Sequence, residues 1–398
     1  MKKCPDCNIA IDSHFKECPC CGALQLTSIP FPITSLNGTD IWCLSQLKLT
    51  PGNLLTGHCV KSLGIAQSIF SRVSNLIGGE VPELTEIFNG GRKSALRQME
   101  QAAKENQASG ILSVAQEIIT HGSNLEFLAK GAGVHGSTSE GFFSSANCAR
   151  DLLITNDLGF QPKQALIESV IYSTGSAGGI MGALKTMGQG EVKEYTELFN
   201  QTRQSAVERL EMQAASQGFS AILGITVKIL PLGFSPAKEL VLLGTGCSHP
   251  ALNNTEVISS GISPYDLWNL SKAGYFPVKL LIQSAVISLG VVNGLASTFK
   301  AAIKNDLGEM ANLVRSARAS VLVKMEDLAR QAGAYAVIGT DFSVHDLGNG
   351  LMELCATGTA IKRFETIQPL SDVLPQQVIF PRNIMFCDQT DWLHNPPK

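Results

Sequence analysis

Residues 92–112 read RKSALRQMEQAAKENQASGIL, and two later stretches of the same chain repeat this pattern. Residues 203–223 read RQSAVERLEMQAASQGFSAIL, and residues 318–338 read RASVLVKMEDLARQAGAYAVI. Each stretch begins with an arginine, places a serine two residues later and a glutamate eight residues later, and then enters an apolar run. The copies lie 111 and then 115 residues apart, which is the size of a domain and too long for a solenoid repeat. The sequence therefore predicts three tandem copies of one fold.

Each copy is predicted to fold as strand, helix, strand, strand. Residues 165–172 and 279–288 are apolar and β-branched, which is typical of a strand. Residues 195–217 carry apolar side chains at three- and four-residue steps, which predicts a long amphipathic helix. Residues 221–230 and 238–246 indicate two strands with a short connection, so we expect them to be antiparallel. The predicted class is α+β, with two-layer β-α-β-β domains, mainly antiparallel sheets and a separate core in each copy.

Two pairs of cysteines near the N-terminus predict a zinc site. Cys4 and Cys7 form one C-x-x-C pair, and Cys18 and Cys21 form the second. Four thiolates at this spacing can surround one Zn²⁺ tetrahedrally and so fold a segment that has almost no core of its own. The segment resembles the small zinc ribbons that precede many bacterial domains. We expect Cys20, inside the second pair, to be a spare thiol.

Clusters of turn-forming residues mark the predicted domain boundaries. The predicted units are a zinc ribbon over residues 1–30, copy 1 over 36–137, copy 2 over 145–252, copy 3 over 260–366, and a C-terminal tail over 367–398.

Composition limits the classes of partner. Hydrophobic residues make up 44% of the chain and charged residues 16%, so large cores are possible and a disordered chain is excluded. A formal net charge of -3 gives no overall field for nucleic acid or an anionic membrane. No secretory signal is visible and the cysteines suit a reducing compartment, so we expect a cytoplasmic protein. The uncharged run over residues 280–299 contains several polar residues, and we interpret it as a strand and a helix rather than a membrane span.

With these features, the copies resemble the YbjQ-like family of small α/β proteins. The resemblance lies in the glycines before the long helix (Gly78 and Gly79; Gly188 and Gly190), in the helix itself, and in a last strand that ends at residues 357–362. It covers about residues 36–366. It implies domains that assemble into rings, commonly of five, and it brings a family label of heavy-metal binding.

The repeats themselves give little sign of chemistry. Cysteines and histidines do not recur at equivalent positions, so a metal site common to the copies is not expected. The glycines of residues 131–136 fit G-x-G-x-x-G, but no helix follows them, so we interpret them as a domain end and not as a dinucleotide site. The recurring arginines and helix glutamates either bind a small anion or form salt bridges, between neighbouring copies or along the helix. We favour the salt bridges.

The leading hypothesis is a non-enzymatic, zinc-binding scaffold that forms homo-oligomeric rings, with a pentamer as the expected number. One alternative is an adaptor whose ribbon recruits a protein partner, with nucleic acid less favoured and a membrane not expected. The other is a heavy-metal-binding protein or enzyme with sites between domains. Three copies in one chain could lie side by side in one ring, or each could join a different ring of a stack. The diverged ends of the copies favour the stack.

Overall fold

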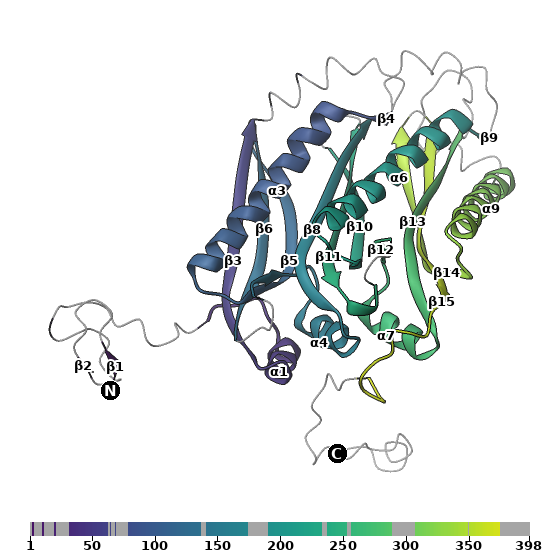
Figure 1. The fold of residues 1–398 in the computed structure, drawn as a ribbon. Helices are drawn as coiled ribbons and strands as arrows, with labels where there is room; N and C mark the ends of the chain where they lie inside the picture. The colour runs from purple at the N-terminus through teal and green to yellow at the C-terminus, as the bar shows by residue number, and fades with distance from the viewer. Residues whose placement is uncertain are drawn as a thin grey trace, which may run out of the picture.

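Three units of the same design follow one another along the chain and lie side by side in a row (Figure 1). The computed structural model describes residues 32–62, 79–136, 141–173, 190–232, 237–252, 256–288, 307–348 and 350–374, together with residues 2–3, 10–11, 20, 64 and 68. The three ranges that the repeats predicted fall into three successive sheets, each with a long helix against it.

The elements recur in the same order in each copy. Copy 1 contains α1 (Gly38–Gln46), β3 (Leu49–Ser62), β4 (Gly79–Glu80), α3 (Pro82–Glu105), β5 (Gly110–His121), β6 (Asn124–Gly136) and then β7 (Phe143–Ser144). Copy 2 contains α4 (Ala149–Asp157), β8 (Gln161–Ser173), β9 (Gly190–Glu191), α6 (Lys193–Ser216), β10 (Ala221–Pro231), β11 (Ala237–Ser248), the short 3-10 turn η1 (Pro250–Leu252) and β12 (Ile258–Ser259). Copy 3 contains α7 (Pro264–Lys272), β13 (Tyr275–Ser288), α9 (Leu307–Gln331), β14 (Ala336–Gly348) and β15 (Leu351–Arg363). Near the N-terminus, β1 (Lys2–Lys3) pairs with β2 (Ala10–Ile11).

The α+β class and the order strand, helix, strand, strand are confirmed. The helix predicted over residues 195–217 is α6, and it ends just before Gly218, whose φ of +74° suits glycine. The last two strands of each copy pair antiparallel, as expected from their short connection. The short helices α1, α4 and α7 were not predicted, although Asn37 and Ser263 accept hydrogen bonds as N-caps of two of them.

Two-residue strands link each copy to the next. In β4, Gly79 and Glu80 of copy 1 pair antiparallel with the edge of β8 in copy 2. In β9, Gly190 and Glu191 of copy 2 do the same to β13 in copy 3. Gly79 and Gly190, two of the glycines that precede the long helices, therefore extend the sheet of the following copy. The strands β7 and β12 lie after their copies and pair in parallel with β5 and β10.

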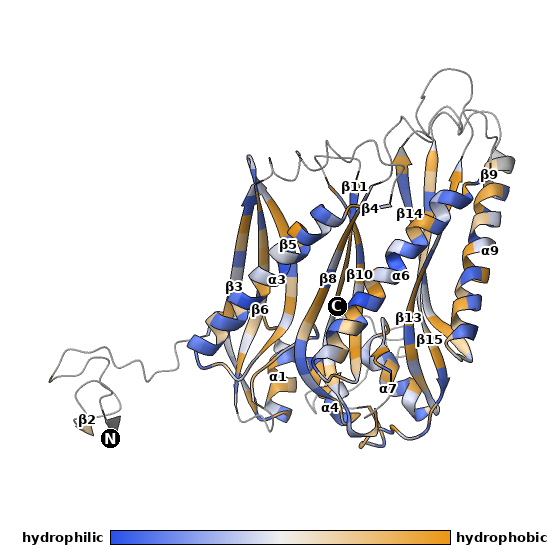
Figure 2. Ribbon diagram, turned by 45° about the horizontal axis from the view of Figure 1, so that its top comes forward, coloured by the Kyte–Doolittle hydropathy of each residue, from blue (hydrophilic) through white to orange (hydrophobic). Residues whose placement is uncertain are grey.

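The expectation that each copy has its own core is wrong for copies 1 and 2. One hydrophobic cluster joins Phe88 and Met99 of α3 to Ile167 and Ile171 of β8. A second joins α6 to β13 in the same way, through residues such as Phe199 and Val286. Each of these helices therefore packs against its own sheet and against the first strand of the next copy (Figure 1), and hydrophilic and hydrophobic residues alternate along α6 (Figure 2).

Of the two arrangements considered, the structure shows the copies side by side rather than separated into different layers. Copies that share strands and cores cannot each belong to a different ring. Among the helices of the described ranges, none is long and apolar enough to cross a membrane.

Candidate functional site

The contact between consecutive copies contains a buried ion pair. Arg92 of α3 in copy 1 reaches Glu239 of β11 in copy 2, with Nε 2.7 Å from Oε1 and Nη2 2.7 Å from Oε2. Both side chains are almost fully buried. Ser169 of β8 donates a further hydrogen bond to Oε1 of the same carboxylate, at 2.5 Å. This two-pronged geometry is the one in which guanidinium and carboxylate bind most strongly and with the most specific orientation.

The same pair recurs between copies 2 and 3. Arg203 of α6 donates from Nη2 to Glu353 of β15, and both side chains are again buried. The rings of Tyr172 and Phe199 each lie 5.3 Å from the guanidinium carbon. Burial is the largest single effect on the pKa of Arg203 and lowers it, but the carboxylate of Glu353, together with Tyr172 and Cys355, raises the pKa by more, so the net shift is upward and the arginine stays charged.

The glutamates of the three copies occupy one position of the fold. Glu239 stands opposite Ile171 in the strand ladder, and Glu353 stands opposite Val286. Glu126 of β6 stands opposite Val60 in copy 1 in the same way. Each copy therefore presents one carboxylate at the same place of its sheet, and in copies 2 and 3 the preceding copy supplies the arginine.

The helix glutamates make a different contact. Glu100 accepts a hydrogen bond from the hydroxyl of Ser144 at 2.6 Å, and Glu211 accepts one from Ser259 at 2.6 Å. The same two hydroxyls accept from the backbone of the next copy, Ser144 from Ala165 N and Ser259 from Leu280 N, both at 3.0 Å. Each serine thus links the helix of one copy to the first strand of the next.

Salt bridges also hold the two-residue strands in place. Arg209 of α6 donates from Nη1 and Nη2 to the carboxylate of Glu80 in β4, at 2.7 and 2.6 Å. Glu191 of β9 accepts from Nζ of Lys324 in α9 at 2.5 Å and from the hydroxyl of Ser320 at 2.9 Å. These carboxylates belong to one copy and their partners to the next, so the contact between copies repeats in several separate parts.

The recurring arginines of copies 1 and 2 therefore form salt bridges, as favoured, but their partners differ from the expected ones. Arg92 and Arg203 form salt bridges between neighbouring copies, but to strand glutamates and not to Glu100 or Glu211 on their own helices. The sequence contained a signal for this, because Glu126, Glu239 and Glu353 recur at the start of each last strand. Spacing along the helix could not reveal it, since the partners are 147 and 150 residues apart.

The four cysteines of the expected zinc ribbon, Cys4, Cys7, Cys18 and Cys21, lie outside the described residues. Cys20 is described and is exposed with a free thiol. Within the ranges that the structure describes, His, Cys, Asp and Glu side chains do not form any group of three or more that could hold a metal ion. Cys247 and Cys355 are buried, and burial raises the pKa of each thiol, to about 12 and about 11.

Comparison with known proteins follows the same threefold division. A family model described as "Putative heavy-metal-binding" matches residues 51–136, 161–249 and 277–363, which together make up more than half of the chain. An encapsulin nanocompartment protein of Mycobacterium tuberculosis is 25% identical over 252 residues, which are 60% of this chain and 94% of that protein. A UPF0145 protein of Methanocella arvoryzae is 34% identical over 76 residues, and one of Methanoregula boonei is 39% identical over 57 residues.

The two archaeal alignments cover 19% and 14% of this chain, and 62% and 48% of the relatives. The chain thus spans about half to two thirds of the length of these relatives. The three matched segments coincide with the three sheets and their long helices. The chain belongs to the YbjQ family and contains three consecutive domains of it.

Proposed function

We propose that this protein is a non-enzymatic scaffold that assembles with identical chains. The observation that carries the proposal is the repeated contact between copies, made with the same buried ion pair both times. A pair of buried charges contributes little net stability, but it strongly penalises any arrangement that leaves one charge without its partner. Such a contact selects one way of placing domain beside domain, which is what a building block requires.

The name of one relative supports the same proposal. The mycobacterial relative is named as an encapsulin nanocompartment protein, and its 252 matched residues span more than two copies of this chain. A relative that is named for a nanocompartment is consistent with a role in assembly. In the described residues, exposed apolar and charged side chains lie at the two ends of the row, where a second chain could bind.

Self-association can be tested by the native mass of the full chain. One chain has a mass of 42.5 kDa. At micromolar concentration, in ordinary salt and without added ligand, the expected species has the mass of two or more chains. A species of 42.5 kDa alone, at every concentration up to tens of micromolar, would remove the scaffold proposal.

Zinc is the further part of this proposal, and it rests on the chemistry of four thiolates at C-x-x-C spacing. Cys4, Cys7, Cys18 and Cys21 would hold one Zn²⁺ and fold the N-terminal segment around it. The ion would have a structural role and would supply no catalysis.

Replacing Cys4 and Cys7 with serine is expected to reduce bound zinc from about one ion per chain to none, because two thiolates alone do not complete a structural site. Elemental analysis of purified protein measures this directly. The same variant should keep the circular dichroism spectrum of the three domains, since their cores lie elsewhere. The matched control is Cys20→Ser, which removes the exposed thiol between the second pair and should leave the zinc content unchanged. Stoichiometric zinc in the double variant would contradict the assignment.

A further inference from the structure

The two ends of the row carry the two halves of the ion pair that the chain makes twice internally. Arg318 of α9 stands 115 residues after Arg203, at the same position of its helix. It is exposed, and it has no ion-pair partner within the part of the chain that the structure describes. At the other end, Glu126 has no preceding copy beside it, and its carboxylate meets Nε2 of His121 at 2.6 Å.

Apolar side chains at the two ends are exposed where their counterparts are buried. Val60 at the free face of copy 1 is 55% exposed, whereas Ile171 and Val286 at the same ladder position are both 0% exposed. In α9, Leu322 is 47% exposed, whereas Leu96 and Val207 at its position in the other helices are 4% and 2% exposed. The difference arises because a neighbouring copy covers the internal positions, whereas among the described residues no copy covers the two ends.

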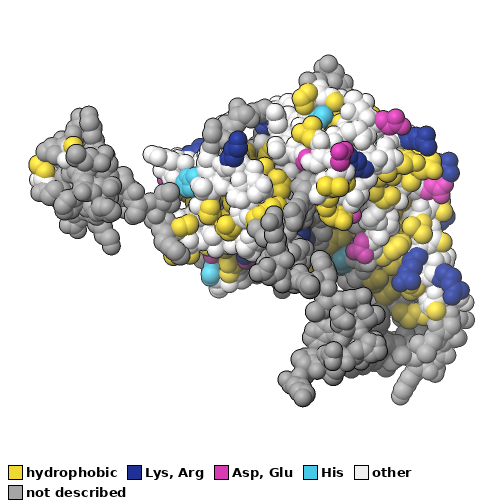
Figure 3. Space-filling model, turned by 90° about the horizontal axis from the view of Figure 1, so that it is seen from below, with side chains coloured by type: hydrophobic (Ala, Val, Ile, Leu, Met, Phe, Trp, Pro, Cys, Tyr) yellow, Lys and Arg dark blue, Asp and Glu magenta, His cyan; other side chains and the backbone are white. Residues whose placement is uncertain are grey.

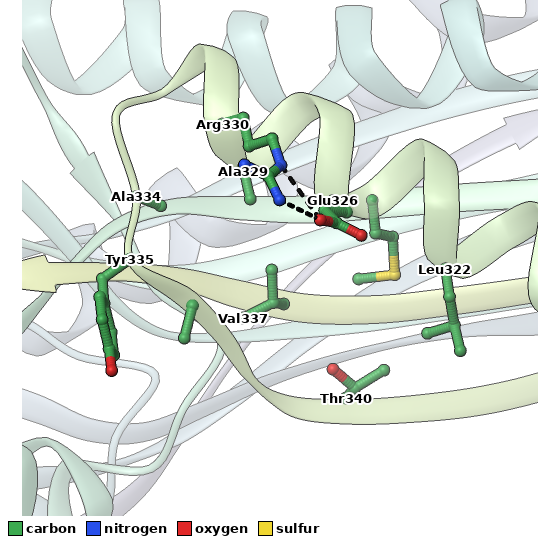
Figure 4. A pocket seen from close by; sticks show the side chains of 10 residues that line it. Leu322, Glu326, Ala329, Arg330, Ala334, Tyr335, Val337 and Thr340 are labelled. Carbon is green, nitrogen blue, oxygen red and sulfur yellow. Dashed lines mark hydrogen bonds and ion pairs between the residues drawn. The ribbon is translucent and has the colours of Figure 1, made fainter.

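Copy 3 also has an open groove where copies 1 and 2 hold a strand. The groove has a volume of about 410 Å³ and lies between α9 and the start of β14 (Figure 4). Its walls include Met325, Val337 and the paired side chains of Glu326 and Arg330. In copy 1 the equivalent position beside Gly110 and Ile111 is filled by β7, and in copy 2 the position beside Ala221 and Ile222 is filled by β12. Hydrophobic side chains also lie at the surface of the copy 3 end of the molecule, beside lysines and arginines (right side of Figure 3).

The chain has a third segment of the kind that fills this groove, and it lies in front of copy 1. Residues 32–34 precede α1 at the same distance at which β7 precedes α4 and β12 precedes α7. The backbone carbonyl of Ile33 accepts from Leu54 N at 2.7 Å, at the position where the side-chain hydroxyls of Ser144 and Ser259 accept from Ala165 N and Leu280 N. The Ile33 side chain itself is 76% exposed.

Differences among the three segments match differences among the grooves. Ser144 and Ser259 donate to Glu100 and Glu211, whereas the third segment has the apolar Ile33 at that position. The glutamate of the third groove does not need a hydroxyl, because Arg330 donates to Glu326 from Nε at 3.0 Å and from Nη2 at 2.5 Å. Pro32 cannot donate the backbone hydrogen bond that Phe143 and Ile258 make, so the third segment is held by one such bond fewer.

We propose that copy 3 of one chain docks onto copy 1 of a second chain, with Arg318 paired to Glu126 and residues 32–34 lying in the groove of copy 3. The inference rests on the proposed self-association and names the surfaces that meet. α9 and β3 lie at opposite ends of the row (Figure 1), so a chain cannot make this contact with itself. The contact is heterologous, and its repetition closes a ring or extends a filament. Every chain adds three domains, so a ring of five domains cannot form in this way.

The test is the dissociation constant of the full chain, measured by light scattering over a dilution series, in wild type and four variants. Arg318→Glu and Glu126→Arg each place like charges at the contact and should weaken association by at least about thirtyfold, because 2 kcal/mol or more is lost when a buried charge pair is broken. Ile33→Asp places a carboxylate near Glu326 and should weaken association by at least about tenfold. The matched control is Arg97→Glu, which should leave the constant unchanged, because Arg97 is an exposed residue of α3 whose counterpart in copy 2, Glu208, bonds to Gln204 of its own helix.

Each variant must keep the wild-type circular dichroism and thermal unfolding of its domains, which is expected because Arg318 and Ile33 are exposed. Association of wild-type strength in both charge variants would overturn the docking mode while leaving self-association intact. A wild-type chain that remains monomeric would instead overturn the proposed function as well. Weakening by Arg97→Glu equal to that by Arg318→Glu would show a general charge effect and would also overturn the docking mode.

Discussion

Replacing Arg92 with methionine is expected to lower the free energy of unfolding by about 3–5 kcal/mol, the usual cost of removing one partner of a buried ion pair. The variant leaves the carboxylate of Glu239 buried with one neighbouring hydroxyl, that of Ser169, and without its guanidinium. The carboxylate must then stay charged in an apolar surrounding or take up a proton. Urea unfolding, followed by circular dichroism in the Arg318→Glu background, measures the loss without a contribution from chain association.

A double variant distinguishes the effect of the two charges from the effect of the volume that the two side chains fill. Arg92→Met combined with Glu239→Leu removes both charges, and it should recover most of the loss, because apolar side chains of similar volume can replace a buried ion pair at little cost. Arg97→Met is the control on the same helix, at an exposed position. A loss below 1 kcal/mol for Arg92→Met alone would contradict the buried geometry between copies 1 and 2.

Gly57→Ala is expected to destabilise copy 1 by about 1–3 kcal/mol or more, the cost of overpacking a filled interior. A Cβ at Gly57 would lie 2.2 Å from the carbonyl oxygen of Ala95 and 2.4 Å from the amide nitrogen of Met99. Both atoms belong to the backbone of α3, so the helix itself must move away from β3. The same unfolding experiment measures the effect.

The matched control for this substitution lies within α3. A Cβ at Gly90 would meet no heavy atom within 4 Å, so Gly90→Ala should be neutral or stabilising by about 0.5–1 kcal/mol through the helix preference of alanine. If Gly57→Ala is as well tolerated as Gly90→Ala, the close approach of α3 to β3 is wrong.

Much of the fold could be predicted because it depends on patterns within one copy. The step of apolar residues through Phe199, Ala206 and Leu210 reports which side of α6 is buried, and this pattern is visible in the sequence. The repeat also made the three copies recognisable, since the same arginine and glutamate return at the same spacing.

The relation between copies could not be predicted in the same way. Gly79 and Glu80 look like a turn before a helix, because the strand that they extend, β8, lies about 90 residues further along the chain. The partner of Arg92 is 147 residues away, and periodicity carries no information about such a distance. The helix glutamates Glu100 and Glu211 seemed to be the natural partners because they are near in sequence, yet they bind serine hydroxyls.

The stacked arrangement was favoured because the ends of the three copies differ in sequence, and it was not found. The ends of the copies differ, as expected if each copy had its own partners in its own layer. In the structure the differences follow position in the row instead. Ile33 replaces the serine of the other two segments, and Glu326 binds Arg330 in place of a hydroxyl.

The most direct test of head-to-tail docking mixes two variants that cannot assemble alone. A chain with Arg318→Glu keeps a normal Glu126, and a chain with Glu126→Arg keeps a normal Arg318, so together they can form one wild-type contact and one contact in which the two charges are exchanged. At a concentration below their weakened dissociation constants, native mass spectrometry of each variant alone should show 42.5 kDa chains, and the equimolar mixture should show complexes that contain chains of both kinds. A mixture that stays monomeric while wild-type chains associate, or variants that assemble alone as the wild type does, would contradict the docking of copy 3 on copy 1.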